Sequence, residues 1–342
     1  MVILHHEEND NAARWPLSGR GKIKPLDRAR LLLAAGLLAS LVVFVVIAVF
    51  AGAARVLSEI LHARVYIYAL AFASVTAAYS MRFWKWDYYT RILKLRVPRR
   101  KNFLVYLSTY SMKITPGGIG TVIAAYTLKR MTKRGFMRIV PIVAMNLFTD
   151  YMSFALLALV AALYTGRYVI YVAALATLLV IPFLLLMQPH IFNRLRARAG
   201  RRTIVGRAFT HAGRYYSALG ALNKPKVYIV SLCLSLPADF TMSLALFLTL
   251  RSLGIRSHIA LSTFVFSASQ IIGMVSTLPG GLGAAEVSYV ALLRVVMGLS
   301  VAVGSAAAIM TRLATLWFGV ILGTVVLVYT MRYWRKRTNA SR

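Results

Sequence analysis

Two stretches of this chain are nearly identical: Thr115-Pro116-Gly117-Gly118-Ile119-Gly120 and Leu278-Pro279-Gly280-Gly281-Leu282-Gly283. Each one interrupts a long apolar run. Proline fixes φ and lacks a backbone donor, and glycine permits positive φ, so neither stretch can continue a regular helix. Broken backbone at membrane depth survives only where protein or a water-filled cavity satisfies its polar groups. The two breaks therefore predict a pair of discontinuous elements around one central site.

The composition is that of a membrane protein. The 342 residues are 59% hydrophobic and 15% charged, whereas soluble domains carry about 25% charged residues. Several apolar runs are long enough to cross a hydrocarbon core of roughly 30 Å. The net charge is +32, and the basic residues that produce it lie between these runs. Positive-inside bias and contact with anionic lipid at the cytoplasmic surface explain this charge better than nucleic-acid binding does.

No catalytic or cofactor pattern accompanies the apolar runs. The single cysteine, Cys233, lies in an apolar segment, so neither disulfides nor a Cys/His metal site is indicated. The sequence contains no nucleophile elbow, HExxH motif or Walker loop. A polar and then basic arm precedes the first apolar run, unlike a signal peptide. We expect a non-enzymatic protein without cofactor or metal. Either a gradient drives its transport, or the protein lets lipid equilibrate between the leaflets.

The loop charges predict six full spans with both termini in the cytoplasm of a cell-membrane protein. The spans are about 31–51, 65–81, 139–163, 168–187, 227–250 and 302–330. Residues 52–64 are expected as a short external loop. Residues 82–89, which read Arg82-Phe83-Trp84-Lys85-Trp86-Asp87-Tyr88-Tyr89, are expected as an interfacial girdle.

The two broken segments, about 103–128 and 259–297, are predicted to be re-entrant helical hairpins. In the first, each apolar arm is too short to span, and basic clusters on both sides favour entry and return on the cytoplasmic face. The second is nearly free of basic residues, so it can enter and return on the outside. The fold class is therefore an all-α polytopic membrane protein with about six transmembrane helices and two re-entrant hairpins.

An inverted-topology repeat follows from these orientations. Aligning Pro116 with Pro279 pairs the glycines of both breaks and places Tyr126 on Tyr289. The alternative is coincidence, because Pro-Gly-Gly is a common turn. The predicted organisation is a basic arm at 1–30, one membrane domain at 31–335 and a cytoplasmic tail at 336–342. Within the domain the repeat units are about 65–163 and 227–330, separated by a basic loop at 188–226.

Ionisable residues at membrane depth are costly and usually functional. Those in this chain are Lys113, Asp150, Asp239, Glu286 and Arg312. Two half-helix N-termini facing one cavity would suit a phosphate-bearing headgroup, together with Lys113 and Arg312. We expect Asp150 and Asp239 to pair with those cations or to relay protons. A purely structural reading, with Asp150–Arg312 or Glu286–Lys113 ion pairs, stays open. The full predicted site is Lys113, Thr115, Pro116, Gly117, Gly118, Gly120, Asp150, Asp239, Pro279, Gly280, Gly281, Gly283, Glu286 and Arg312.

The chain resembles a known family over roughly residues 30–335. The motifs are Trp84-x-Trp86, Ile114-Thr115-Pro116-Gly117-Gly118-x-Gly120, Leu278-Pro279-Gly280-Gly281-Leu282-Gly283-x-x-Glu286, and Thr311-Arg312-Leu313 with Trp317. They resemble the membrane region of lysylphosphatidylglycerol synthases, a flippase-like family that also occurs as stand-alone proteins. The resemblance implies a lipid flippase. The aminoacyl-transferase domain of the synthases has no counterpart here, so lysyl transfer is not implied.

The first half departs from the family pattern. Family members often carry Glu where this chain has Thr121, and a Glu-Arg pair where Asn146 and Leu147 stand.

Two functional hypotheses remain. The first is a flippase for an anionic or isoprenoid-linked glycolipid. The second is an accessory module that recruits a glycosyltransferase through loop 188–226. A membrane-embedded lipid-modifying enzyme is a third reading, for which no motif is present. The expected partners are a lipid with a phosphate-bearing headgroup and either a glycosyltransferase or a second copy of the chain, and not nucleic acid.

Overall fold

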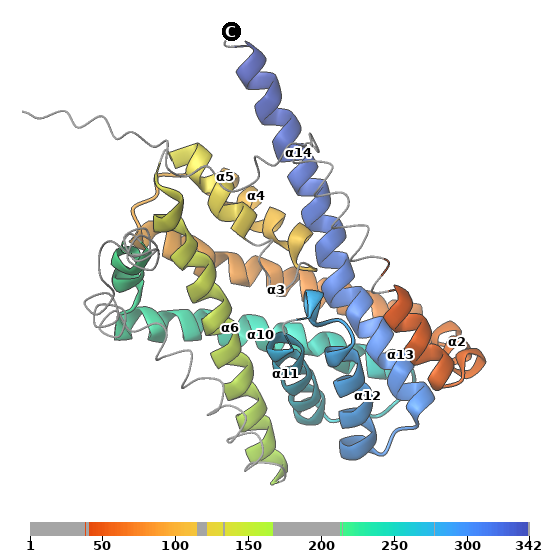
Figure 1. Cartoon of the computed structure of the whole chain (residues 1–342). Coiled ribbons are helices and arrows are strands. Elements are labelled where there is room, and N and C mark those ends of the chain that lie inside the picture. The colour runs from red at the N-terminus through yellow and green to blue at the C-terminus, as the bar shows by residue number, and fades with distance from the viewer. Residues whose placement is uncertain are drawn as a thin grey trace, which may run out of the picture.

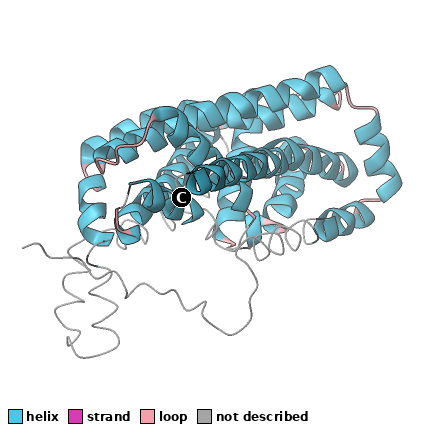
Figure 2. Cartoon of the chain, turned by 90° about the horizontal axis from the view of Figure 1, so that it is seen from above, coloured by secondary structure: helices cyan, strands magenta, loops and turns pink. Residues whose placement is uncertain are grey.

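The computed structural model describes residues 38, 41–114, 122–132, 134–166, 213, 215–276 and 278–340. Within these ranges the chain is helical and contains no strand (Figure 2). The elements are α2 (Ala53–Leu61), α3 (Val65–Ile92), α4 (Arg99–Ser108), η1 (Thr109–Met112), α5 (Val122–Thr132), α6 (Phe136–Thr165), α10 (Pro225–Ser252), α11 (Ile259–Val275), η3 (Pro279–Gly281), α12 (Ala284–Met297), α13 (Val301–Arg312), η4 (Leu313–Trp317) and α14 (Phe318–Ala340).

Four segments of the described chain are long and apolar enough to cross a membrane. They are Phe136–Thr165, Pro225–Ser252, Pro279–Met297 and Val301–Thr330. The first, second and fourth confirm the helices predicted at 139–163, 227–250 and 302–330. The protein is therefore an all-α polytopic membrane protein, as predicted. The span predicted at 168–187 lies outside the described residues, as do the arm at 1–30 and most of loop 188–226, so the count of six stays a prediction.

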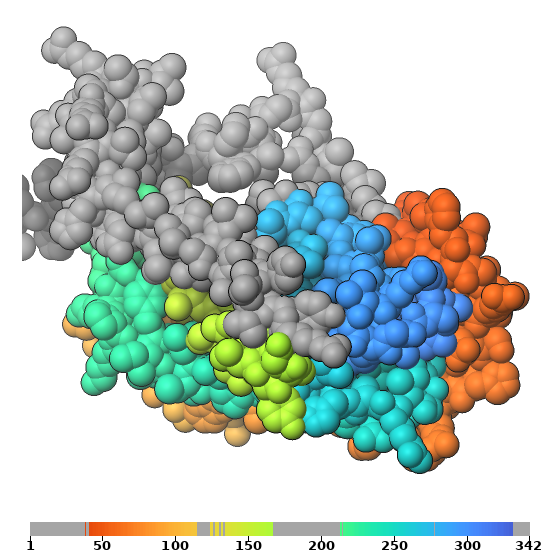
Figure 3. All heavy atoms as spheres, turned by 90° about the horizontal axis from the view of Figure 1, so that it is seen from below, coloured from red at the N-terminus to blue at the C-terminus, as the bar shows by residue number. Residues whose placement is uncertain are grey.

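The prediction of a loop at 52–64 is wrong. A helix over Leu41–Phe50 ends near the predicted end of the first span, and the chain then bends by 106° into a second helix, α2. Gly52, with φ of 85°, makes this bend. Val56 of α2 packs against Ala306 and Ile309 of α13. Seen from below, α2 lies at one edge of the molecule beside the C-terminal helices (Figure 3).

The prediction of an interfacial girdle at 82–89 is also wrong. Helix α3 does not end at residue 81 but continues to Ile92, and it buries Arg82, Lys85, Trp86 and Asp87. These charged side chains lie inside the protein because α6, α10 and α4 bring them polar partners. Asn102 of α4, for example, donates to Asp87 Oδ1 at 2.9 Å and accepts from Trp86 Nε1 at 3.0 Å.

Helices α3 and α10 form the centre of the fold and run antiparallel along most of their lengths. The backbone N–H of Arg64, at the start of α3, donates to the carbonyl of Ser252, at the end of α10, at 2.8 Å. Further along, Lys85 donates to Ser235 Oγ at 2.8 Å. In Figure 1, α4 and α5 lie above this pair, whereas α11 and α12 lie below it.

The two longest apolar segments cross this centre in opposite directions. In Figure 1, α6 descends from the level of α5, and α13 with α14 rises from the lower right to the C-terminus. The rising segment contains the π-helical turn η4 directly after Arg312. Single π turns are rare and frequently lie at functional sites, and Tyr79 of α3 donates its hydroxyl to Thr315 O in this turn at 2.5 Å. Helix α3 thus supports this irregular turn.

Candidate functional site

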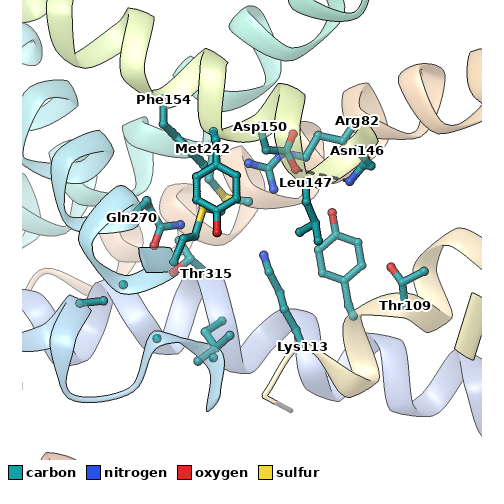
Figure 4. Close-up of a pocket in the computed structure, with 18 of the residues that line it drawn as sticks. Arg82, Thr109, Lys113, Asn146, Leu147, Asp150, Phe154, Met242, Gln270 and Thr315 are labelled. Atoms are coloured by element: carbon teal, nitrogen blue, oxygen red, sulfur yellow. Dashed lines mark hydrogen bonds between the residues drawn. The ribbon is translucent and has the colours of Figure 1, made fainter. Parts of the chain in front are cut away.

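A cavity of about 250 Å³ lies where α3, α6 and α10 meet the ends of the two broken segments. Residues of both predicted repeat units line it. Its polar lining includes Arg82, Thr109, Lys113, Asn146, Asp150, Gln270, Arg312 and Thr315. Apolar side chains such as Leu147, Phe154 and Met242 complete the wall (Figure 4). A cavity with a mainly apolar wall and a few polar groups directed into it is typical of a ligand site.

The second break reaches this cavity through Gly280 and Gly281. Pro279–Gly281 forms a single 3-10 turn, in which the Gly281 N–H donates to Leu278 O at 2.9 Å. Gly280 and Gly281 have φ of 61° and 68°, which favour glycine. A Cβ on Gly281 would also lie 2.9 Å from the Gly273 carbonyl oxygen of α11. The Gly-Gly pair is therefore required both by its dihedrals and by close packing on α11.

Glu286 and Arg312 hold the second break together. The Gly283 N–H donates to Glu286 Oε2 at 2.7 Å, which caps α12. Arg312 Nε donates to Glu286 Oε1 at 2.6 Å, and its Nη2 donates to Gly280 O at 2.6 Å. Both side chains are almost completely buried, at 0% and 4% exposure. The alternative Glu286–Lys113 pair is wrong, because Arg312 of α13 is the partner of this carboxylate.

Asp150 lines the cavity from α6, and its cation partner lies behind it. Lys85 of α3 donates to Asp150 Oδ1, to Thr149 Oγ1 at 3.0 Å and to Ser235 Oγ of α10 at 2.8 Å. The ammonium is completely buried. The alternative Asp150–Arg312 pair is wrong, since Lys85 occupies this carboxylate. The cluster joins three helices at one point.

Asp239 of α10 lies behind the cavity wall and binds Arg82 of α3. The Arg82 Nε donates to Asp239 Oδ1 at 2.8 Å, and Nη2 donates to the same oxygen. The guanidinium also lies 5.7 Å from the ring centroid of Phe154 on α6. Arg82 itself reaches the cavity lining, whereas Asp239 is 0% exposed. The sequence named the acid of this pair but not its cation.

Lys113 differs from the other cations of the cavity. Its side chain extends from the end of η1 toward the middle of the space, facing the wall that carries Arg82 and Asp150 (Figure 4). Its Nζ lies 5.2 Å from the ring centroid of Tyr110. Within the described part of the chain, no carboxylate forms an ion pair with it. Among the described cations that line the cavity, Lys113 is therefore the one without a carboxylate partner.

The first break lies outside the described residues. This applies to Thr115, Pro116, Gly117, Gly118 and Gly120, so their predicted role stays a prediction. Helix α5 begins directly after them at Val122 and packs on α6. Of the remaining predicted site residues, Pro279 opens the turn of the second break and Gly283 is the N-cap of α12.

Two site residues, Arg82 and Lys85, were missed by the sequence reasoning. A count of charges could have shown that further cations were needed. Three acids, Asp150, Asp239 and Glu286, were placed at membrane depth with only two cations, and buried carboxylates need partners. Cations directly flank several predicted spans, and Arg82 and Lys85 follow the second one. Extending that span by one or two turns brings these two inside, but the count alone does not select them.

The described residues contain no group of three or more His, Cys, Asp or Glu side chains that could hold a metal ion. Apart from the Asp150 carboxylate, which Lys85 binds, the polar side chains of the cavity are an amine, guanidinium groups, amides and hydroxyls, which are suited to bind an oxyanion. Such an arrangement can orient a charged headgroup by hydrogen bonds.

The comparison with known families agrees with the motifs. The model of the lysylphosphatidylglycerol synthase TM region matches residues 34–323, which include both breaks and every residue of the cavity lining. A comparison with individual curated proteins finds no match. The matched range covers most of the 342 residues. The chain therefore belongs to the lysylphosphatidylglycerol synthase transmembrane-region family.

Proposed function

We propose that this protein is a non-enzymatic lipid flippase. It moves an anionic or isoprenoid-linked (glyco)lipid between the leaflets of the cell membrane, with the headgroup passing through the cavity between the two broken segments. The observation that carries the proposal is Lys113, a cation directed into that cavity and without a carboxylate partner in the described chain. An unpaired cation in an apolar, half-closed space is unfavourable unless an anion visits it.

The order of the helices supports an inverted repeat. Helices α3 and α10 each contain 28 residues. Helix α6 contains 30 residues, and its counterpart, made of α13, η4 and α14, runs without a gap from Val301 to Ala340. In each predicted unit, a broken segment lies between the 28-residue helix and this longer element. The same order of elements is expected if both units descend from one ancestral element.

The arrangement of the two units supports the inversion. Helices α3 and α10 run antiparallel, α6 and α14 run in opposite directions, and the broken segments lie on opposite sides of the α3–α10 pair (Figure 1). Inverted repeats with broken helices place their ligand near the membrane midplane and open to either side by movement of one unit against the other. With such a path, the acyl chains stay in the lipid while the headgroup crosses.

The test is transfer between leaflets by the full chain in liposomes. A phosphate-bearing fluorescent lipid is added, and an impermeant quencher reports how fast the label becomes accessible. Lys113→Gln should slow transfer by about tenfold or more, because a hydrogen bond to a charged group is lost from the crossing headgroup. The matched control is Lys226→Gln, which removes one charge from an exposed lysine at the start of α10.

Equal transfer rates in wild type, Lys113→Gln and empty liposomes would refute the flippase proposal. Transfer by wild type that Lys113→Gln leaves unchanged would refute the role of this cavity. The competing accessory-module hypothesis depends on loop 188–226, most of which lies outside the described residues.

A further inference from the structure

Carboxylates are scarce in this chain, and their positions restrict which headgroups can bind. The sequence contains nine acidic residues. Four of them, Glu7, Glu8, Asp10 and Asp27, lie in the N-terminal arm. The other five are Glu59, Asp87, Asp150, Asp239 and Glu286. No acid occurs in residues 115–121 or 167–212, so these stretches add none to the cavity whatever their structure.

Every buried carboxylate of the described chain already has a cation partner. Asp150 binds Lys85, Asp239 binds Arg82, Glu286 binds Arg312, and Asp87 binds Arg91 and Arg99. Glu59 lies on α2, which contributes nothing to the cavity lining. These carboxylates are thus already neutralised by cations of the chain. A ligand ammonium would therefore gain less from them than from a carboxylate without a cation partner, because the neighbouring cation repels it.

The charges around the cavity do not cancel. Four cations lie in or directly behind its wall, namely Arg82, Lys85, Lys113 and Arg312, against three acids, Asp150, Asp239 and Glu286. The difference of 4 − 3 leaves one positive charge. Three of the cations are held by the three acids, so this charge is located at Lys113. Its ammonium is a compact donor that binds phosphate as a point charge.

The family description names lysylphosphatidylglycerol, whose lysyl ester carries two ammonium groups beside one phosphate. For this chain the geometry points to the opposite selectivity. We propose that the cavity selects lipids whose phosphate-bearing headgroup has no ammonium group and rejects aminoacylated headgroups, with Lys113 as the residue that determines this choice. The inference rests on the flippase proposal for its place in transport, but it concerns binding and is tested by binding.

The experiment measures which headgroup the purified full chain prefers in detergent. Dihexanoyl phosphatidylglycerol and its lysyl ester compete at equal concentration, and native mass spectrometry counts each bound lipid. Wild type should prefer the anionic lipid by roughly 10- to 100-fold, because both lipids offer Lys113 a phosphate but only the lysyl ester brings two ammonium groups near this cation. Lys113→Gln should reduce this preference to about that of unspecific surface binding, whereas the matched control Lys226→Gln should keep it.

Charge reversal gives the sharper test. Lys113→Glu supplies the carboxylate without a cation partner that the wild-type cavity lacks, so the preference should invert toward the lysyl ester. If this variant does not fold, the comparison of Lys113→Gln with Lys226→Gln still tests whether Lys113 determines the preference. Equal binding of both lipids by wild type, or an unchanged preference in Lys113→Gln, would overturn the inference.

A third measurement uses inorganic phosphate as the competitor. Displacement of the anionic lipid only at a much higher phosphate concentration supports a lipid headgroup as the ligand, and displacement at a similar concentration would overturn that assignment. The outcomes also separate the two proposals. If the protein binds the anionic lipid selectively but does not transfer it between leaflets, the flippase proposal is refuted and the selectivity proposal stands. If it transfers both lipids equally, the selectivity proposal is refuted and the flippase proposal stands.

Discussion

The two broken segments have closely similar sequences but different charges around them. Pro116 and Pro279 differ by 163 positions, and the same offset places Ile123 on Glu286 and Lys113 on Ser276. It also places Thr149 on Arg312. The second half therefore has a carboxylate and a guanidinium where the first has an apolar residue and a hydroxyl, and the first has an amine where the second has a hydroxyl.

This difference indicates a division of roles between the halves. In the second half both charges are used internally, because Glu286 caps α12 and Arg312 ties it to the Gly280 carbonyl. In the first half the pair is absent and one ammonium faces the cavity. Charge in the second half stabilises the break, whereas charge in the first half is available to a ligand. Each of the following substitutions tests this division.

The largest loss of stability is expected for Arg312→Ala. The substitution leaves the Glu286 carboxylate buried without a cation and the Gly280 carbonyl without its donor, which should lower the free energy of unfolding by roughly 3–5 kcal/mol. Denaturant unfolding of the purified protein in detergent measures it. The control is Arg294→Ala on α12, whose side chain is exposed. Similar losses in both variants would mean that the clamp at the second break has no stabilising role.

Lys85→Met should have the next largest effect, about 3 kcal/mol, because it leaves Asp150 unpaired beside the cavity. This variant tests whether the first half is stabilised by the ion pair between α3 and α6 rather than by contacts of its broken segment. A double-mutant cycle with Asp150→Asn isolates the pair and should give a coupling free energy of about 2 kcal/mol. Additive losses would show that Lys85 acts through Ser235 and Thr149 instead.

Gly281→Ala should cost about 2–3 kcal/mol, from the strained positive φ together with overpacking against the Gly273 carbonyl. The matched control is Gly254→Ala, which has φ of 77° but open space around its Cβ. The control isolates the dihedral and should cost about 1 kcal/mol. The same substitution at Gly118, which the offset of 163 pairs with Gly281, shows whether the first break packs as closely. Equal losses at 281 and 254 would contradict the close approach to α11.

Lys113→Gln should change the free energy of unfolding least, by under about 0.5 kcal/mol or in the stabilising direction, because an unpaired cation in an apolar space is unfavourable before a ligand binds. Its effect should instead appear in lipid binding and transfer. The same unfolding measurement on Lys113→Gln and Arg312→Ala compares the two halves directly. A loss at Lys113 as large as that at Arg312 would remove the proposed division of roles.

The sequence predicted the parts of this protein that depend on local rules. The long helices α6 and α10 and the segment Val301–Thr330 follow from long apolar runs with few charged residues. The second break follows from Pro279 and its glycines. Even the position of Glu286 could be anticipated as special, because a carboxylate three residues after a helix N-cap is placed to accept the N-cap N–H.

Partner choice among the buried charges was decided by the tertiary structure. Lys85 and Asp150 lie 65 residues apart, and Arg82 and Asp239 lie 157 apart. Which cation meets which acid depends on the register between helices, and a shift of one residue turns a side chain by about 100° around its helix. The hydropathy pattern places the end of the second span before Arg82, because a hydropathy scale treats each charged residue as if it had no partner. Only the packing of α3 against α6 and α10 supplies the partners that allow these charges inside, and it leaves Lys113 as the one cation in the described cavity without an acid.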